Sequence, residues 1–116
     1  MRKQTRREMA TEAIHAGETH DTSGAHIAPI YQTSTFTFPD MAAVEARAAG
    51  ESDSYMYSRG GNPGRTALAA KLAALEGGGT EGISAEIFAS GMAAITAALM
   101  GTAKTGDHII TQQVLY

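Results

Sequence analysis

The sequence predicts an α/β fold: an incomplete parallel-sheet domain preceded by an extended N-terminal arm. In the second half, helical patterns alternate with short apolar runs, which is typical of parallel strands joined by helices. In the first half, a period-two run over residues 27–38 indicates extended chain. The apolar pattern then continues to Tyr116 without a closing turn. We therefore expect an arm with short helices over residues 1–55 and the start of a truncated α/β domain over 56–116.

The arm is expected to begin with one short helix and to continue as extended chain. Thr11 can cap a helix over residues 12–16, which Gly17 would end. Pro29 favours an extended conformation for the residue before it, and threonines then alternate along residues 27–38. This segment is predicted to be an extended arm or an edge strand.

Two helices are predicted from their N-terminal residues. Asp40 follows a proline and can cap a helix from residue 41 to about residue 49, where a glycine follows. Asn62 and Pro63 have the composition of an N-cap and a first helical position, because proline lacks an amide that would be unpaired there anyway. The helix over residues 63–76 has leucines along one face and ends in three glycines.

The last part of the chain predicts a strand, a helix and a second strand. Residues 83–89 carry apolar side chains at alternate positions, and Ser90 can cap the helix that follows over residues 91–103. That helix is apolar nearly all round, so we expect it to be buried. After a Gly-Asp turn, residues 108–112 predict the next strand.

Composition limits the classes of protein to consider. The 116 residues carry no cysteine, which excludes disulfide frameworks and cysteine-based metal sites. The net charge of −3 argues against a general nucleic-acid surface. No apolar run approaches the ~20 residues that span a membrane, and the spacing of the four histidines fits no common metal site. We therefore expect a cytoplasmic protein without nucleic-acid, membrane or metal partners.

The stretch from Tyr57 to Pro63, Tyr-Ser-Arg-Gly-Gly-Asn-Pro, joins three features that suit an anion. Arg59 offers a planar fork of donors that matches a phosphate or carboxylate. Tyr57 adds a hydroxyl that points the same way in an extended segment, and the two glycines allow a close approach of ligand to backbone. A surface ion pair for Arg59 and simple packing of the tyrosine are the alternatives.

A second anion-binding feature lies at the start of the helix over residues 91–103. The first amides of a helix lack internal partners and carry partial positive charge, so a phosphate binds there. Ser90 adds a hydroxyl, and Gly91 lets an anion come close. By itself this pattern also fits an ordinary N-cap.

Together these motifs resemble the N-terminal part of the pyridoxal-phosphate enzymes of cysteine and methionine metabolism, a family that includes cystathionine γ-synthase, the cystathionine lyases, methionine γ-lyase and O-acetylhomoserine sulfhydrylase. The similar segments occur in the family's order from about residue 11 onwards. They are Thr11-Glu12-Ala13-Ile14-His15-Ala16-Gly17, Pro29-Ile30-Tyr31-Gln32-Thr33-Ser34-Thr35-Phe36, Tyr57-Ser58-Arg59-Gly60-Gly61-Asn62-Pro63, Leu75-Glu76-Gly77, Ala89-Ser90-Gly91-Met92-Ala93-Ala94-Ile95 and Gly106-Asp107-His108.

The resemblance implies a fold-type I domain with pyridoxal 5'-phosphate as cofactor. Tyr57 and Arg59 match the pair that holds the phosphate in a neighbouring subunit of a homo-oligomer, expected to be a tetramer. Ser90, Gly91 and Met92 match the phosphate cradle within the same subunit. Tyr116 matches the tyrosine that stacks on the pyridine ring and assists proton transfer, which makes it the catalytic candidate. Gly64 departs from the family, which usually has threonine there.

The implied reaction is elimination or replacement at the β- or γ-carbon of a sulfur amino acid or an acylated homoserine. The family's Schiff-base lysine has no counterpart here: Lys3, Lys71 and Lys104 match no such motif, and the last two are expected to be solvated. We therefore expect a fragment that is inactive by itself. The alternatives are a free-standing phosphate- or nucleotide-binding module, although no Walker or dinucleotide motif is present, and a non-catalytic interaction fragment.

Overall fold

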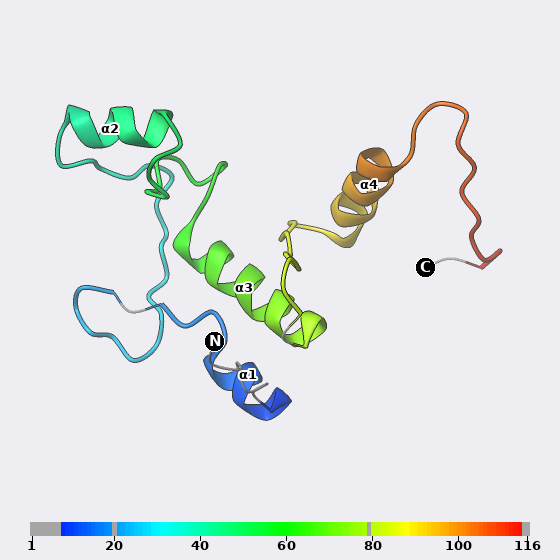
Figure 1. Cartoon of the computed structure of the whole chain (residues 1–116), viewed down its shortest axis with the longest axis horizontal. Helices are drawn as coiled ribbons and strands as arrows, with labels where there is room; N and C mark the ends of the chain where they lie inside the picture. Colours follow the sequence, from blue (N-terminus) through cyan, green and yellow to red (C-terminus); the bar gives the residue numbers. More distant parts are fainter. Residues whose placement is uncertain (1–7, 20, 79, 115–116) are drawn as a thin grey trace. The chain divides into compact units, whose positions relative to one another are not determined.

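The computed structural model describes residues 8–19, 21–78 and 80–114, and four helices form within these ranges (Figure 1). The chain divides into two compact units, Met1–Glu86 and Ile87–Tyr116. The first unit holds the first three helices and the second unit holds the last. They are α1 (Met9–His15), α2 (Met41–Ala48), α3 (Pro63–Gly77) and α4 (Gly91–Thr102).

Three helices begin at the polar residues predicted to cap them. Asp40, Asn62 and Ser90 each have an extended backbone, and the side chain of each accepts a hydrogen bond from an amide in the first helical turn, at 2.9, 3.0 and 3.2 Å respectively. The caps form locally because a short polar side chain reaches amides that the helix leaves unpaired. The predictions for α2, α3 and α4 are therefore confirmed at their starts.

The start of α1 differs from the prediction. The helix begins at Met9, with Glu8 as an N-cap that makes no side-chain hydrogen bond, so Thr11 lies inside the helix and does not cap it. The predicted end is confirmed, because the chain leaves the helix at Ala16 and Gly17 adopts a left-handed φ of 71°. The glycine in the sequence was enough to predict the end of the helix, since few residues other than glycine adopt this conformation.

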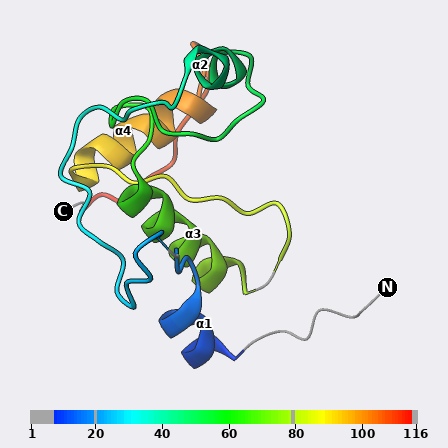
Figure 2. The same cartoon turned by 90° about the vertical axis from the view of Figure 1, so that its left-hand side faces the viewer.

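Helix α1 packs against α3, as Figures 1 and 2 show. At the contact, Lys71 Nζ donates a hydrogen bond to the carbonyl of Ile14 at 3.1 Å. Lys71 is half-buried, so it is only partly solvated, and its ammonium group also makes a contact that was not predicted. Ala16, at the same contact end of α1, is 8% exposed and is the one buried apolar residue among those the structure describes.

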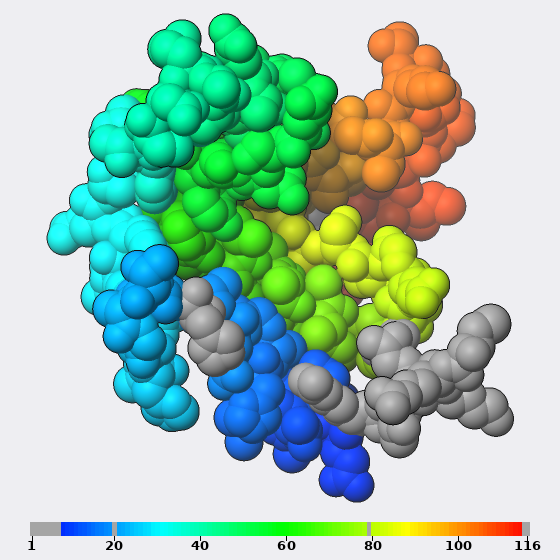
Figure 3. Space-filling view, turned by 60° about the vertical axis from the view of Figure 1, so that its left-hand side comes forward, coloured from blue at the N-terminus to red at the C-terminus, as the bar shows by residue number. Residues whose placement is uncertain are grey.

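The extended segment over residues 27–38 forms no strand in the described structure. One isolated antiparallel bridge joins Thr35 to Tyr57, flanked by hydrogen bonds from Phe36 N to Met56 O (3.0 Å) and from Ser58 N to Ser34 O (2.8 Å). In Figure 3 this segment is cyan and lies beside the green residues that come later in the chain. The predicted edge strand is thus reduced to a short pairing with the Tyr57 region.

The predicted strands over residues 83–89 and 108–112 do not form in the part of the chain that the structure describes. A strand requires a neighbour to pair its backbone groups, and a parallel neighbour comes only after a crossover connection. No such pairing occurs between described residues, so these segments stay irregular.

Helix α4 was predicted to be buried, but its apolar side chains are exposed. Met92 is 66% and Met100 is 78% accessible. Within the described residues of its own unit, no second helix or strand forms that could cover it. Across the described ranges, no helix has both the length and the apolar character needed to cross a membrane.

Candidate cofactor-phosphate site

The first predicted site feature lies on a tight turn that follows the Thr35–Tyr57 bridge. The amides of Gly60 and Gly61 both donate to the carbonyl of Tyr57, at 2.9 and 3.1 Å. The turn brings the guanidinium carbon of Arg59 to 5.3 Å from the centroid of the Tyr57 ring, a distance suited to a cation–π interaction. The structure therefore brings these two predicted residues together on an exposed surface.

The Arg59 guanidinium has no ion-pair partner among the described residues. The neighbouring arginines are engaged: Arg65 lies 3.7 Å from Glu86 and donates to the carbonyl of Gly60 at 3.1 Å, and Arg47 donates to the carbonyl of Ser54 at 2.6 Å. The donors of Arg59 are thus available to a ligand. Among the described residues, no carboxylate pairs with this side chain and would compete with an anion. The geometry fits a phosphate group.

The second feature is the N-terminus of α4. Ser90 Oγ accepts from Ala93 N at 3.2 Å, while the amides of Gly91 and Met92 have no partner in the described part of the chain. A Cβ built on Gly91 meets nothing within 4 Å, so there is open space beside this residue. Two unpaired amides at a helix N-terminus, with open space beside Gly91, also fit a phosphate. This feature belongs to the second unit, whereas Tyr57 and Arg59 belong to the first.

The remaining predicted site residue, Tyr116, lies outside the described residues. Among the described residues, no group of three or more histidine and acidic side chains is arranged to hold a metal ion. His15 instead forms a hydrogen bond between its Nδ1 and Glu18 Oε1 at 3.0 Å.

The sequence profile described as "Cys/Met metabolism PLP-dependent enzyme" matches residues 10–116, which is nearly the whole chain. The chain belongs to this family. The match confirms the family predicted from the motifs and, with it, pyridoxal phosphate as the family's cofactor.

Curated relatives in the family carry different activities. The chain is 45% identical over 107 residues to an L-methionine gamma-lyase of Porphyromonas gingivalis, covering 92% of this chain and 26% of the relative. It is 41% identical over 107 residues to an O-acetyl-L-homoserine sulfhydrylase of Corynebacterium glutamicum, covering 91% of this chain and 24% of the relative. The chain thus spans about a quarter of the length of these relatives.

A solved structure of this family supports the predicted fold class. A Campylobacter jejuni protein assigned as an O-acetylhomoserine (thiol)-lyase superposes with a TM-score of 0.73 at 34% identity, over 85% of this chain and 23% of that one. That structure contains N'-pyridoxyl-lysine-5'-monophosphate. The likeness is consistent with a fold-type I domain, although the sheet itself does not form among the residues described here.

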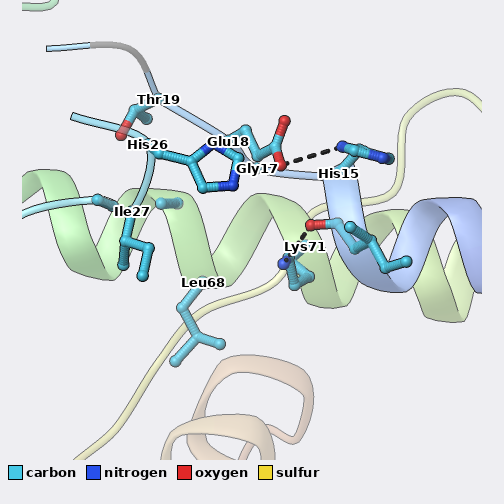
Figure 4. A pocket seen from close by; sticks show the side chains of 11 residues that line it. His15, Gly17, Glu18, Thr19, His26, Ile27, Leu68 and Lys71 are labelled. Atoms are coloured by element: carbon cyan, nitrogen blue, oxygen red, sulfur yellow. Dashed lines mark hydrogen bonds and ion pairs between the residues drawn. The ribbon is translucent and has the colours of Figure 1, made fainter. Parts of the chain in front are cut away.

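A groove in the part of the chain that the structure describes lies away from the predicted site. It has a volume of about 580 Å³ and lies between the end of α1, residues 26–28 and α3, as Figure 4 shows. Its polar lining includes His15, His26 and Lys71. None of the predicted phosphate-binding residues lines it, so the groove does not bear on the cofactor site.

Two residues beside the predicted site make hydrogen bonds that the sequence did not predict. Asn62 was interpreted only as a helix cap, yet its Nδ2 also donates to the carbonyl of Tyr31 at 3.0 Å. Ser58 was assigned no role, yet its hydroxyl donates to the carbonyl of Thr33 at 2.5 Å. The one available signal was that an asparagine cap uses its oxygen and leaves two amide donors to be satisfied elsewhere.

Proposed function

We propose that the chain is the N-terminal part of a pyridoxal-phosphate enzyme that eliminates or replaces a group at the β- or γ-carbon of a sulfur amino acid or an acylated homoserine. The observation that carries this proposal is the family match over residues 10–116, which includes both phosphate-binding features. The activities named for the relatives, L-methionine gamma-lyase and O-acetyl-L-homoserine sulfhydrylase, support this substrate class.

In this proposal the chain holds cofactor phosphate at two places. Ser90, Gly91 and Met92 hold the phosphate of the cofactor in their own subunit, through the hydroxyl and two helix amides. Tyr57 and Arg59 hold the phosphate in the neighbouring subunit of a homotetramer built from dimers. A dianion is stabilised by charge-assisted hydrogen bonds from both sides, which explains why the Arg59 donors stay open among the described residues.

The same proposal gives Tyr116 a role on the cofactor ring. Its ring would stack on the pyridine and fix the orientation of the cofactor, and its phenol would move a proton close to the substrate. The bound cofactor supplies an electron sink for the carbanion that forms when the substrate loses its α-proton. The lysine and the aspartate that complete such a site have no counterpart in these residues.

The test uses the whole protein that contains this chain. We expect it to acquire the visible absorbance of bound cofactor on addition of pyridoxal phosphate, and residues 1–116 alone to acquire none because their lysines match no cofactor-binding motif. The activity assay has two arms: release of a thiol from L-methionine, and sulfide-dependent consumption of O-acetyl-L-homoserine.

Three results would contradict the proposal. They are a whole protein without cofactor absorbance, a whole protein that binds the cofactor but acts in neither arm, and a folded monomer of residues 1–116 that binds a nucleotide saturably. The last result would favour the alternative of a free-standing phosphate- or nucleotide-binding module.

A further inference from the structure

We propose that Asn62 and Ser58 are positioning residues for phosphate binding. They attach the turn that carries Tyr57 and Arg59 to the extended segment over residues 31–36, and so fix the direction in which the guanidinium is presented. The inference rests on the proposed function, because it concerns the same phosphate.

Asn62 uses both ends of its side-chain amide. Its Oδ1 accepts from Gly64 N at 3.0 Å and caps α3, while its Nδ2 donates to the carbonyl of Tyr31 at 3.0 Å. The same nitrogen lies 3.4 Å from Ser58 Oγ. The side chain therefore links the start of α3, the turn and the extended segment, and it is half-buried, so water replaces these bonds poorly.

Ser58 is attached to the extended segment twice. Its hydroxyl donates to the carbonyl of Thr33 at 2.5 Å, and its amide donates to the carbonyl of Ser34 at 2.8 Å. Ser58 lies between the two predicted phosphate ligands, so these bonds hold the backbone from which both side chains project. The Ser58 amide bond, together with the bond from Phe36 N to Met56 O, forms the antiparallel bridge between Thr35 and Tyr57.

These attachments matter for binding because the Arg59 side chain is itself exposed and unpaired among the described residues. A long side chain loses conformational entropy when it binds a ligand, and the loss is larger if its backbone must be ordered at the same time. A backbone already fixed on both sides removes that second cost. Loosening it should weaken binding of the phosphate without removing any group that touches the phosphate.

The experiment compares pyridoxal phosphate with pyridoxal, which lacks the phosphate, as ligands of the whole assembled protein. Asn62→Ser keeps an oxygen that can cap α3 and loses the amide donor, since serine and asparagine cap about equally well. Ser58→Ala loses the hydroxyl, and Ser58→Thr restores it. We expect Asn62→Ser and Ser58→Ala to weaken the affinity for pyridoxal phosphate about tenfold, to leave the affinity for pyridoxal within about twofold, and Ser58→Thr to recover most of the loss.

The control variants separate this inference from its alternatives. Asp40→Ala removes the cap of α2 and so shows the effect of losing a helix cap alone; it should not discriminate between the two ligands. Equal losses for both ligands in Asn62→Ser, or no loss in Ser58→Ala, would overturn the inference. If Arg59→Ala also fails to discriminate between the ligands, the proposed function of the Tyr57–Arg59 pair fails. If only Arg59→Ala discriminates, that function stands and the positioning role fails.

Discussion

Arg59 differs from Arg47 and Arg65 because its guanidinium has no protein oxygen as a partner among the described residues. We predict that Arg59→Ala weakens the affinity of the whole protein for pyridoxal phosphate about 10- to 100-fold, since hydrogen bonds to charged groups contribute about 1.5–3 kcal/mol. Arg59→Lys keeps the charge but loses the fork, so its loss should be intermediate. Equilibrium titration of the apoprotein measures both, and full affinity in Arg59→Ala would refute the assignment.

The structure lowers the pKa of Asp21 from its ordinary value of 3.8. The hydroxyl of Ser23 donates to its carboxylate at 2.6 Å, and the amide of Ala25 donates at 3.0 Å, so the ionised form is favoured. The small stabilisation is present above the unfolded pKa and is lost as the pH falls through the lower folded pKa, below about pH 4. We predict that Ser23→Ala raises the pKa of Asp21 towards 3.8 in an NMR titration. An unchanged pKa would show that the Ser23 hydroxyl is not the cause of the lowered value.

At the scale of elements, the docking of α1 on α3 depends on the absence of a side chain at Gly17. A Cβ at this position would lie 2.1 Å from the carbonyl oxygen of Ala67, and the backbone has a φ of 71°. Gly24 has the same φ, but a Cβ there meets nothing within 4 Å. An alanine at position 24 would therefore introduce backbone strain alone. An alanine at position 17 would introduce the same strain and a clash with the backbone of α3.

We predict that Gly24→Ala costs about 1 kcal/mol from backbone strain, and that Gly17→Ala costs clearly more because α1 must move away from α3. Denaturant unfolding of the whole protein measures the total, and amide exchange in α1 shows whether the helix has separated. Equal costs for the two variants would mean that the close approach at Gly17 is not needed in the assembled protein.

At the scale of the whole molecule, the proposal divides each cofactor site between two subunits. Mixing Arg59→Ala subunits with Ser90→Ala subunits tests this division directly. In a mixed dimer, one site should contain two native phosphate-binding features and the other none. We predict that about half of the sites in mixed dimers regain native affinity for pyridoxal phosphate, measured by titration after subunit exchange. No recovery would show that Arg59 serves its own subunit.

The sequence by itself determined the family, the caps of α2, α3 and α4 and the glycine that ends α1. Helix caps, and glycines that end a helix in the left-handed conformation, depend on residues close in the sequence. Four such residues could therefore be recognised without a structure: Asp40, Asn62, Ser90 and Gly17. The division at residues 55 and 56 and the roles of Tyr57, Arg59, Ser90, Gly91, Met92 and Tyr116 stay predictions that rest on the resemblance.

Only the tertiary structure decided which distant segments meet. It showed that Lys71 bonds to α1, that Asn62 and Ser58 bond to the segment over residues 31–36, and that the predicted strands and the apolar faces of α4 lack partners among the described residues. Strand pairing and burial require surfaces brought together from far along the chain, and alternation of side chains shows only that a segment could pair. A helix cap forms between residues close together in the sequence, whereas a strand forms only when another strand pairs with it.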